Sequence, residues 1–215
     1  MADNYLDKKL EEHNARKGTA AHTRRQTNLH TLLTRNRSCR GYDASFIVRD
    51  DQLRSIIEVN TLTPSARNGQ VLRFRPVNHT EAAKLLPHIK LGSALRELHL
   101  PLPGTEPNAF IVICTAADDN KFVYVDLGIS AQSMLLRATE MGLAGICIGA
   151  FDKEAVKKGL SLNLEPLMII AIGRSCEEIR LVEIKEGESQ TYYRKDGIHY
   201  VPKLRAEDII IKQPQ

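Results

Sequence analysis

Three short, almost wholly apolar runs constrain the fold of this chain more than any other feature of its sequence. Residues 109–115 read AFIVICT, and residues 145–149 and 167–172 form two further apolar runs of similar length. Runs of this length that are rich in β-branched side chains are typical of strands buried on both faces. The sequence therefore predicts that these strands lie inside a packed core.

The intervening segments carry the apolar spacing and the end signals of helices. Residues 124–141 present small or apolar side chains on one face and are followed by Gly142, a residue type that commonly ends a helix. Residues 153–160 follow Asp152, a natural N-cap. The remaining predicted helices are residues 3–35, a segment capped by Asp50 or Asp51 that ends before Pro64, and residues 81–91, and the remaining predicted strands are residues 72–77 and 179–184.

Composition limits the class of protein. The chain has 215 residues, of which 42% are hydrophobic and 26% charged, and this average globular usage excludes wholesale disorder, a fibrous repeat and a coiled coil. No internal repeat or linker divides it. We therefore predict a helical extension over residues 1–30 and a single α+β domain over residues 31–215. The extension has little apolar content of its own, so we expect it to pack on another part of the protein or on another subunit.

Cysteine usage and hydropathy indicate the compartment. Cys39, Cys114, Cys147 and Cys176 are widely spaced, without a CxxC pair or a histidine at ligand spacing, which is typical of reduced, buried thiols. The first residues are polar and charged, and the longest apolar runs are far too short to cross a bilayer. The sequence therefore predicts a cytoplasmic protein without a membrane partner or a metal site.

Positive charge is concentrated near the N-terminus. The formal net charge is +4, yet residues 1–40 hold nine Lys or Arg against four acidic residues, so all of the basic excess lies there. The segment RNRSCR at residues 35–40 offers guanidinium groups and a hydroxyl that match phosphate oxygens. Clustered arginines also occur on ordinary solvated surfaces, and a basic arm can bind nucleic acid, although acidic residues interrupt this one.

Two other segments carry groups suited to a planar ligand. PSARNGQ at residues 64–70 has amides that can pair with the edge of a heterocycle, and GLAGICIGAF at residues 142–151 has glycines that allow close backbone approach. Both are also ordinary turn sequences. The chain contains no GxGxxG fingerprint, no P-loop, no GxSxG and no HExxH, which argues against the enzyme classes that these motifs mark.

The order of these segments resembles the nitroreductase-like flavoprotein family. RNRSCRGYD, TPSARNGQVLRF, an apolar strand and DLGISAQSMLLRATEMGLAGICIGAFD follow one another as that family's motifs do, over roughly residues 30–210. Three motifs in order are much more specific than any one of them. The resemblance implies a three-layer α-β-α sandwich around a mixed, mainly antiparallel sheet, assembled as an intertwined homodimer with flavin sites at the interface.

The resemblance also implies which residues hold FMN. The opening motif would bind the phosphate, the ribityl chain and the pyrimidine end, and the second motif would line the ring and the ribityl chain. The third would offer backbone amides to the flavin N5 and O4 edge, and a C-terminal basic pair would reach the phosphate. In the same order these residues are Asn36, Arg37, Ser38 and Arg40; Pro64, Ser65, Asn68 and Gln70; Ile148, Gly149 and Ala150; and Lys203 and Arg205.

Three departures from the family pattern concern the surroundings of the ring and the phosphate. Asn36 stands where the family usually has Arg or His, so one phosphate contact is missing or comes from Arg35. Val71 and Leu72 replace a Pro-Trp pair, and Ala144 replaces a glycine. With these changes FMN is still the expected cofactor, but the electron acceptor is not specified.

The activity implied by the resemblance is electron transfer from NADH or NADPH to FMN and then to a small organic acceptor such as a nitroaromatic or a quinone, in a ping-pong cycle. The flavin carries this chemistry, so no catalytic side chain is required. The alternatives are a dehydrogenase, dehalogenase or enone reductase of the same fold, a non-catalytic flavin- or nucleotide-binding protein, and a nucleic-acid-binding module. The preferred interpretation has a second copy of the chain and a small-molecule acceptor as partners, and no nucleic acid.

Overall fold

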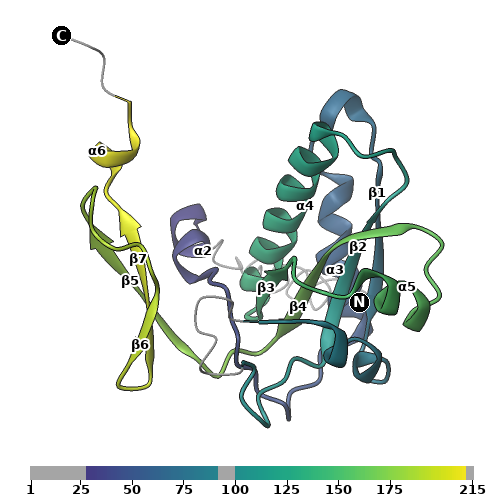
Figure 1. Cartoon of the computed structure of the whole chain (residues 1–215), viewed down its shortest axis with the longest axis horizontal. Helices are drawn as coiled ribbons and strands as arrows, with labels where there is room; N and C mark the ends of the chain where they lie inside the picture. Colours follow the sequence, from purple (N-terminus) through teal and green to yellow (C-terminus); the bar gives the residue numbers. More distant parts are fainter. Residues whose placement is uncertain (1–27, 92–99, 212–215) are drawn as a thin grey trace, which may run out of the picture.

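A computed structural model describes residues 28–91 and 100–211 of the chain (Figure 1). At its centre lies a four-stranded sheet in which all three neighbouring pairs are antiparallel. The three apolar runs of the sequence form three of these strands, as predicted, and one of them, β2, is buried along its whole length. In spatial order the strands are β1 (Leu72–Val77), β2 (Ala109–Thr115), β4 (Glu165–Gly173) and β3 (Ala144–Ile148).

The two faces of this sheet belong to two separate hydrophobic clusters. In β2, Phe110 and Val112 belong to one cluster, while Ala109 and Ile111 belong to the other, because successive side chains of a strand point to opposite faces. The second face is covered by α3 (Asp50–Glu58) and α4 (Lys121–Glu140), and the first by α5 (Lys153–Gly159) together with short 3-10 turns. Helices thus lie on both faces, and the α+β prediction is confirmed.

The long helix α4 and the short helix α5 have the predicted end signals. The side chain of Asn120 accepts a hydrogen bond from the Phe122 amide at 3.0 Å and caps α4, and Gly142 follows that helix with a φ of 77°. Such a left-handed conformation is accessible to glycine without steric cost. Asp152 caps α5 by accepting from the Ala155 amide at 3.0 Å, as predicted.

The start of α3 differs from the prediction by one residue. Its N-cap is Arg49, whose amide donates to the side-chain oxygen of Gln52 at 3.0 Å. Asp50 and Asp51 therefore lie in the first turn rather than at the cap. Carboxylates are favoured there, because the amino end of a helix carries partial positive charge.

One predicted helix is wrong, and another lies largely outside the described residues. The helix predicted at residues 81–91 is wrong: two single-turn 3-10 helices stand there, η3 (Ala82–Lys84) and η4 (Leu86–His88). Pro87 lacks an amide hydrogen and so cannot continue an α-helix. Of the helix predicted at residues 3–35, α2 (Leu29–Arg35) is present, and the rest lies outside the described residues, as does almost all of the predicted extension.

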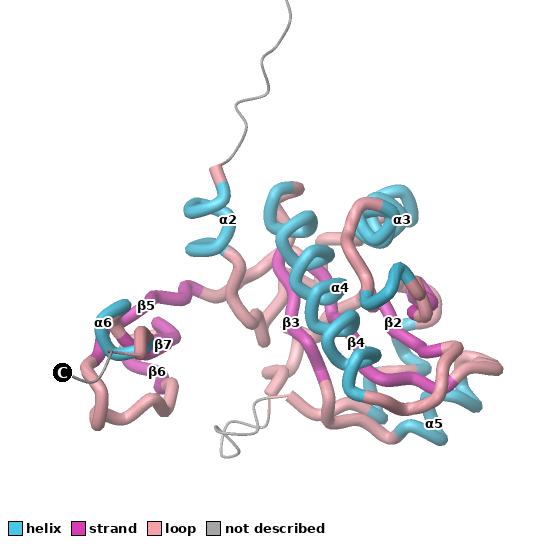
Figure 2. Tube along the Cα trace, turned by 90° about the horizontal axis from the view of Figure 1, so that it is seen from above, coloured by secondary structure: helices cyan, strands magenta, loops and turns pink. Residues whose placement is uncertain are grey.

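A second sheet, of three strands, follows β4 and stands to one side of the first (Figures 1 and 2). Two of its strands were not predicted from the sequence. After it comes α6 (Ala206–Ile209), and the apolar side chains of Ile209, Ile210 and Ile211 are 66%, 65% and 95% exposed. In spatial order the strands are β5 (Glu178–Ile184), β7 (Ile198–Leu204) and β6 (Tyr193–Lys195), with β5 parallel to β7.

Candidate functional site

The arginine-rich segment at residues 36–40 lies along the outer edge of β3. Ser38 forms a parallel bridge with Gly145, and the Cys39 amide donates to the Gly145 carbonyl at 3.1 Å. A side chain at position 145 would collide with Leu135 and with the Ala171 carbonyl, so glycine is what lets the strand pack this closely against α4. The edge of the sheet thereby fixes the backbone of the segment.

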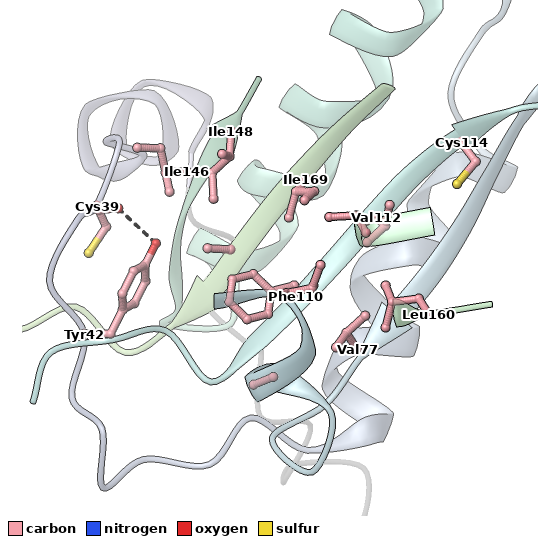
Figure 3. Packing of buried hydrophobic residues seen from close by; sticks show 14 residues of the cluster. Cys39, Tyr42, Val77, Phe110, Val112, Cys114, Ile146, Ile148, Leu160 and Ile169 are labelled. Carbon is pink, nitrogen blue, oxygen red and sulfur yellow. Dashed lines mark hydrogen bonds between the residues drawn. The ribbon is translucent and has the colours of Figure 1, made fainter. Parts of the chain in front are cut away.

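Buried side chains next to Arg40 hold the same segment from inside. The hydroxyl of Tyr42 donates to the Cys39 carbonyl at 2.9 Å, in the cluster that also contains Phe110 and Ile148 (Figure 3). The Cys39 thiol is fully buried and donates to the Gly41 carbonyl at 3.1 Å. Burial raises the pKa of Cys39 to about 12, so the thiol is a packed structural group rather than a nucleophile at neutral pH.

A cavity of about 290 Å³ lies between this segment and the second sheet. Four of the predicted phosphate-end residues and one of the predicted C-terminal basic pair line it together, although they come from distant parts of the sequence. The strand β7 contributes alternate residues, since side chains two apart share a face of a strand. The lining residues are Asn36, Arg37, Ser38, Arg40, Tyr192, His199, Val201 and Lys203.

Nitrogen atoms without partners gather at this cavity. Among the described residues, six buried side-chain polar atoms lack a hydrogen-bond partner, and four of them belong to lining residues: Nε of Arg37, Nε of Arg40 and both ring nitrogens of His199. Buried polar atoms are almost always hydrogen-bonded, so such a cluster needs an external partner. With three cationic side chains in the wall, the cavity suits an anion that presents several acceptor oxygens.

The other nitrogens of the two arginines are used to hold them in place. Arg37 donates from a terminal nitrogen to the Leu33 carbonyl at 2.5 Å, and so satisfies an open carbonyl in the last turn of α2. Arg40 donates to the Ser38 carbonyl at 3.0 Å. The Arg40 amide donates to Oε2 of Glu177 at 2.5 Å, and the other oxygen of Glu177 pairs with Arg194. Both carboxylate oxygens of Glu177 are therefore already engaged.

The loop at residues 64–70 lines a second cavity, of about 350 Å³, beside the amino-terminal part of α4. Pro64, Ser65 and Gln70 line it, whereas Asn68 does not and accepts from the Gln70 side chain at 3.2 Å. The loop is pinned by the buried carboxylate of Asp126, which accepts from the Ala66 amide at 2.8 Å. Asp126 therefore has a structural role in this loop.

Backbone strain marks this loop. Arg67, Asn68 and Gln70 have φ angles of 53°, 53° and 46°, a left-handed conformation that costs free energy in non-glycine residues. The 3-10 turn η2 (Ala66–Asn68) includes the first two of them. Strain of this kind is common in ligand-binding loops that the surrounding structure holds in one shape.

The third predicted group follows β3. Ile148 is buried in the core, whereas Gly149 and Ala150 are exposed where the strand ends. Ala150 lines a cavity of about 430 Å³ together with Lys90 and Phe151. The segment is held by the Lys90 amide, which donates to the Ala150 carbonyl at 2.9 Å.

The arginine cavity and the loop cavity lie far apart within one chain and share no lining residue. Segment 36–40 borders β3, while the loop precedes β1, and these are the two outer strands of the four-stranded sheet, about 14 Å apart at the usual strand spacing. Along α4, Asp126 beside the loop is nine residues from Leu135 beside Gly145, or about 14 Å. The two cavities are therefore separate sites within a single chain.

Two basic residues considered for the phosphate are placed elsewhere. Arg205 does not line the arginine cavity and instead pairs with Asp208 at 3.0 Å, which raises the pKa of the guanidinium. Arg35, considered as a substitute for the family's usual residue at position 36, is exposed in the last turn of α2 and is also absent from the wall. Of the predicted C-terminal pair, the structure brings only Lys203 to the other cations.

Sequence reasoning missed His199 and Tyr192 as wall residues. The signal was present in the alternation of β7: positions 199, 201 and 203 share a face, so a predicted role for Lys203 implies that His199 is its neighbour. Because β7 itself was not predicted, the shared face of positions 199, 201 and 203 was not recognised from the sequence.

Two kinds of feature are absent from residues 28–91 and 100–211. No group of three or more His, Cys, Asp or Glu side chains is placed to hold a metal ion. No helix in the same part of the chain combines the length and the apolar character needed to cross a bilayer.

Comparison with known proteins gives consistent matches. The sequence model of the nitroreductase family matches residues 33–174. The Bacillus subtilis protein named "Putative NAD(P)H nitroreductase YdgI" is 24% identical over an alignment of 184 residues, and the match covers 68% of this chain and 88% of that protein. The Methanocaldococcus jannaschii protein named "Putative nitroreductase MJ1384" is 32% identical over only 57 residues, 26% of this chain and 29% of that protein.

Solved structures share the fold at low sequence identity. A nitroreductase family protein from Streptococcus pneumoniae superposes with a TM-score of 0.62 at 19% identity, covering 86% of this chain and 100% of that one. A protein from Exiguobacterium sibiricum, described as a putative nitroreductase in complex with FMN, has a TM-score of 0.58 at 17% identity and covers 71% of this chain and 90% of its own.

Proposed function

The chain belongs to the nitroreductase family, and on that premise we propose that it is an FMN-dependent oxidoreductase that takes electrons from NADH or NADPH and passes them to a small organic acceptor such as a nitroaromatic or a quinone. Two similar proteins support the assignment by their descriptions, one as an NAD(P)H nitroreductase and one as bound to FMN. The proposed cycle is ping-pong, with donor and acceptor using the same face of the flavin in turn.

The observation that carries the proposal is the cluster of unpartnered nitrogens at the arginine cavity. Arg37 and Arg40 each keep one buried N–H free, and Lys203 adds a third positive charge to the wall. A phosphate monoester has a charge near −2 and three acceptor oxygens, so it suits this donor set. Asn36 and Ser38 supply an amide and a hydroxyl beside the same cations. We assign the FMN phosphate to this cavity.

FMN, when bound, would supply hydride and electron transfer, which no side chain of this protein can perform. The chain's own residues bind and orient. The cations of the arginine segment hold the anionic end, and the strained loop around Ser65 and Gln70 presents polar groups beside an apolar wall of Val71 and Leu72. The thiol within the segment is a poor nucleophile, since burial raises the pKa of Cys39 to about 12.

The separation of the two cavities supports a homodimer. If the loop of residues 64–70 and the segment of residues 36–40 both contact one FMN, they come from two copies of the chain, because one chain holds them at opposite edges of its sheet. The exposed isoleucines at positions 209–211 are a further reason to expect a partner, since apolar side chains this exposed are costly in water.

Spectroscopy of the purified protein tests the proposal. A bound flavin gives a yellow protein, and anaerobic addition of NADH or NADPH bleaches it if the protein is a reductase. A colourless protein that does not bind added FMN would contradict the assignment. A yellow protein that neither nicotinamide reduces would instead be a non-catalytic flavin binder, and reduction without transfer to nitroaromatics or quinones would favour another reaction of the same fold.

A further inference from the structure

His199 has an unusual environment for a buried histidine. Its side chain lies in the wall of the arginine cavity, the residue is 2% exposed, and neither ring nitrogen has a hydrogen-bond partner among the described residues. A neutral imidazole has one donor and one acceptor, and both are normally satisfied when the ring is buried. The ring packs against Tyr192, with centroids 5.2 Å apart and planes tilted by 54°, which fills space but satisfies neither nitrogen.

The charges that face His199 come from every element around it. Arg40 and Arg37 lie on the segment beside β3, Lys203 lies on β7 itself, and Arg194 lies opposite His199 on β6. The nearby acid Glu177 already binds Arg194 and the Arg40 amide, and Glu183 on β5 stands opposite Lys203 in the pairing with β7. Burial lowers the pKa of His199, and Arg40 lowers it further, so the ring is neutral at pH 7 while no anion is present.

We propose that His199 takes up a proton when the phosphate of FMN enters the arginine cavity, and then binds that phosphate as an imidazolium. The proposal rests on the function proposed above. It goes beyond that function by assigning a proton to the binding step and a binding role to a residue that sequence motifs do not mark. The proton comes from solvent and returns there when FMN leaves.

Electrostatics gives the direction and size of the effect. An anion within about 4–6 Å raises the pKa of a cationic acid by roughly 1–3 units. A phosphate dianion beside His199 would therefore raise the pKa that burial and Arg40 lower. At pH values between the pKa of His199 without FMN and its pKa with FMN bound, FMN binding would take up a proton. In that interval the affinity for FMN would fall about tenfold for each unit by which the pH rises. Below the lower pKa, the ring is protonated with or without FMN, and this dependence vanishes.

Two properties of the ligand separate His199 from other sources of pH dependence. The phosphate of free FMN itself loses its second proton near pH 6, so measurements belong above pH 7, where it is already a dianion. Riboflavin carries the same ring without the phosphate. It should bind without proton uptake, because nothing anionic enters the cavity.

Calorimetry on the flavin-free, full-length protein tests the proposal. FMN is titrated at pH 7.2 in two phosphate-free buffers of different ionisation enthalpy, and the difference in heat gives the number of protons taken up. We expect roughly half a proton or more per FMN for the wild type, and close to none for riboflavin. His199→Gln, which can donate but cannot ionise, should abolish the uptake and give an FMN affinity that is flat above pH 7.

The control is His79→Gln, the same change at an exposed histidine, which should leave the uptake unchanged. Uptake that persists in His199→Gln, or its absence in the wild type, would overturn the role of His199 while leaving FMN binding intact. Failure of the wild type to bind FMN would instead refute the proposed function. If His199→Gln does not fold, NMR titration of the wild-type ring with and without FMN replaces it, and an unchanged pKa would count against the proposal.

Discussion

The guanidinium carbon of Arg40 lies 4.7 Å from the centre of the Tyr192 ring. This contact links the arginine segment to the second sheet, because Tyr192 directly precedes β6. A cation that rests on an aromatic face is oriented without using its N–H donors. Nε of Arg40 accordingly stays unpartnered, and the side chain is positioned for an anion before any anion binds.

Removal of this guanidinium should weaken FMN binding strongly. A hydrogen bond to a charged group contributes about 1.5–3 kcal/mol, so Arg40→Ala should raise the dissociation constant by roughly 10–150-fold. The dissociation constant of Arg40→Lys should lie between those of the wild type and Arg40→Ala, because lysine keeps the positive charge but lacks the paired N–H donors of a guanidinium group. Quenching of flavin fluorescence measures the affinity. Arg54→Ala is the matched control, since the Arg54 side chain is 82% exposed on α3 and pairs with Glu58; equal effects of the two alanine variants would show that the phosphate site is misplaced.

Mixed dimers should reveal whether two chains build each site. Arg40→Ala and Gln70→Ala chains, each weak in FMN binding alone, are unfolded together and refolded as a mixture. If each site takes Arg40 from one copy and Gln70 from the other, a mixed dimer has one intact site, and random pairing restores about a quarter of all sites. Flavin content after gel filtration gives this fraction. No recovery above the separate variants would place both residues of a site on one chain.

Gly173 at the end of β4 is predicted to be intolerant of any side chain. A Cβ there would lie 2.7 Å from the Tyr42 ring, and Tyr42 in turn holds the Cys39 carbonyl. Gly173→Ala should therefore cost about 1–3 kcal/mol in the free energy of unfolding, through overpacking, and should loosen FMN binding as well. Urea unfolding measures the first effect.

Gly159→Ala serves as the control for that substitution. Gly159 is the last residue of α5, and a Cβ there would meet its nearest neighbour, the Lys84 carbonyl, at 3.5 Å, an ordinary contact. Alanine also has the higher helix propensity, so stability should stay the same or rise by up to about 1 kcal/mol. If both variants behaved alike, the collision with Tyr42 would not be the cause.

The buried thiol of Cys39 predicts a loss of stability in alkali. Burial raises its pKa to about 12, whereas an unfolded thiol ionises near 8.5. Above that pH the unfolded state releases a proton that the folded state keeps, so the free energy of unfolding falls as pH rises, by up to about 1.4 kcal/mol per unit. Cys39→Ala should make this slope shallower between about pH 9 and 11. Identical slopes would mean that the thiol ionises in the folded state.

Much of the fold followed from patterns that the sequence makes explicit. Strand β2 was predictable because it is apolar at every position except Thr115, and α5 because Asp152 stands at its cap. Pro87 argues against an α-helix at residues 81–91, because it has no amide hydrogen to donate. Strand β7 mixes polar and apolar residues on both faces, so its pattern is weaker, and its pairings with β5 and β6 fix it.

The candidate site was predictable in its parts and not in its arrangement. Motif order placed Arg37, Arg40 and Lys203 in one group, and the structure brings them to one cavity. Nothing in the sequence indicated that the loop of residues 64–70 lies at the opposite edge of the sheet, because that distance depends on strand order. Strand order arises from long-range pairing, which local patterns do not encode.

The parallel bridge between Ser38 and Gly145 has a consequence for solubility. Strand β3 is an outer strand of the described sheet, and its sequence AGICI would attract other chains if its free edge were open, since exposed apolar edges seed aggregation. The opposite outer strand, β1, carries Pro76 and arginines that discourage such pairing. Segment 36–40 thus covers the edge of β3, a strand that has no charged residue or proline to discourage pairing. Substitutions that displace this segment should make the protein aggregate and should also weaken anion binding at the arginine cavity.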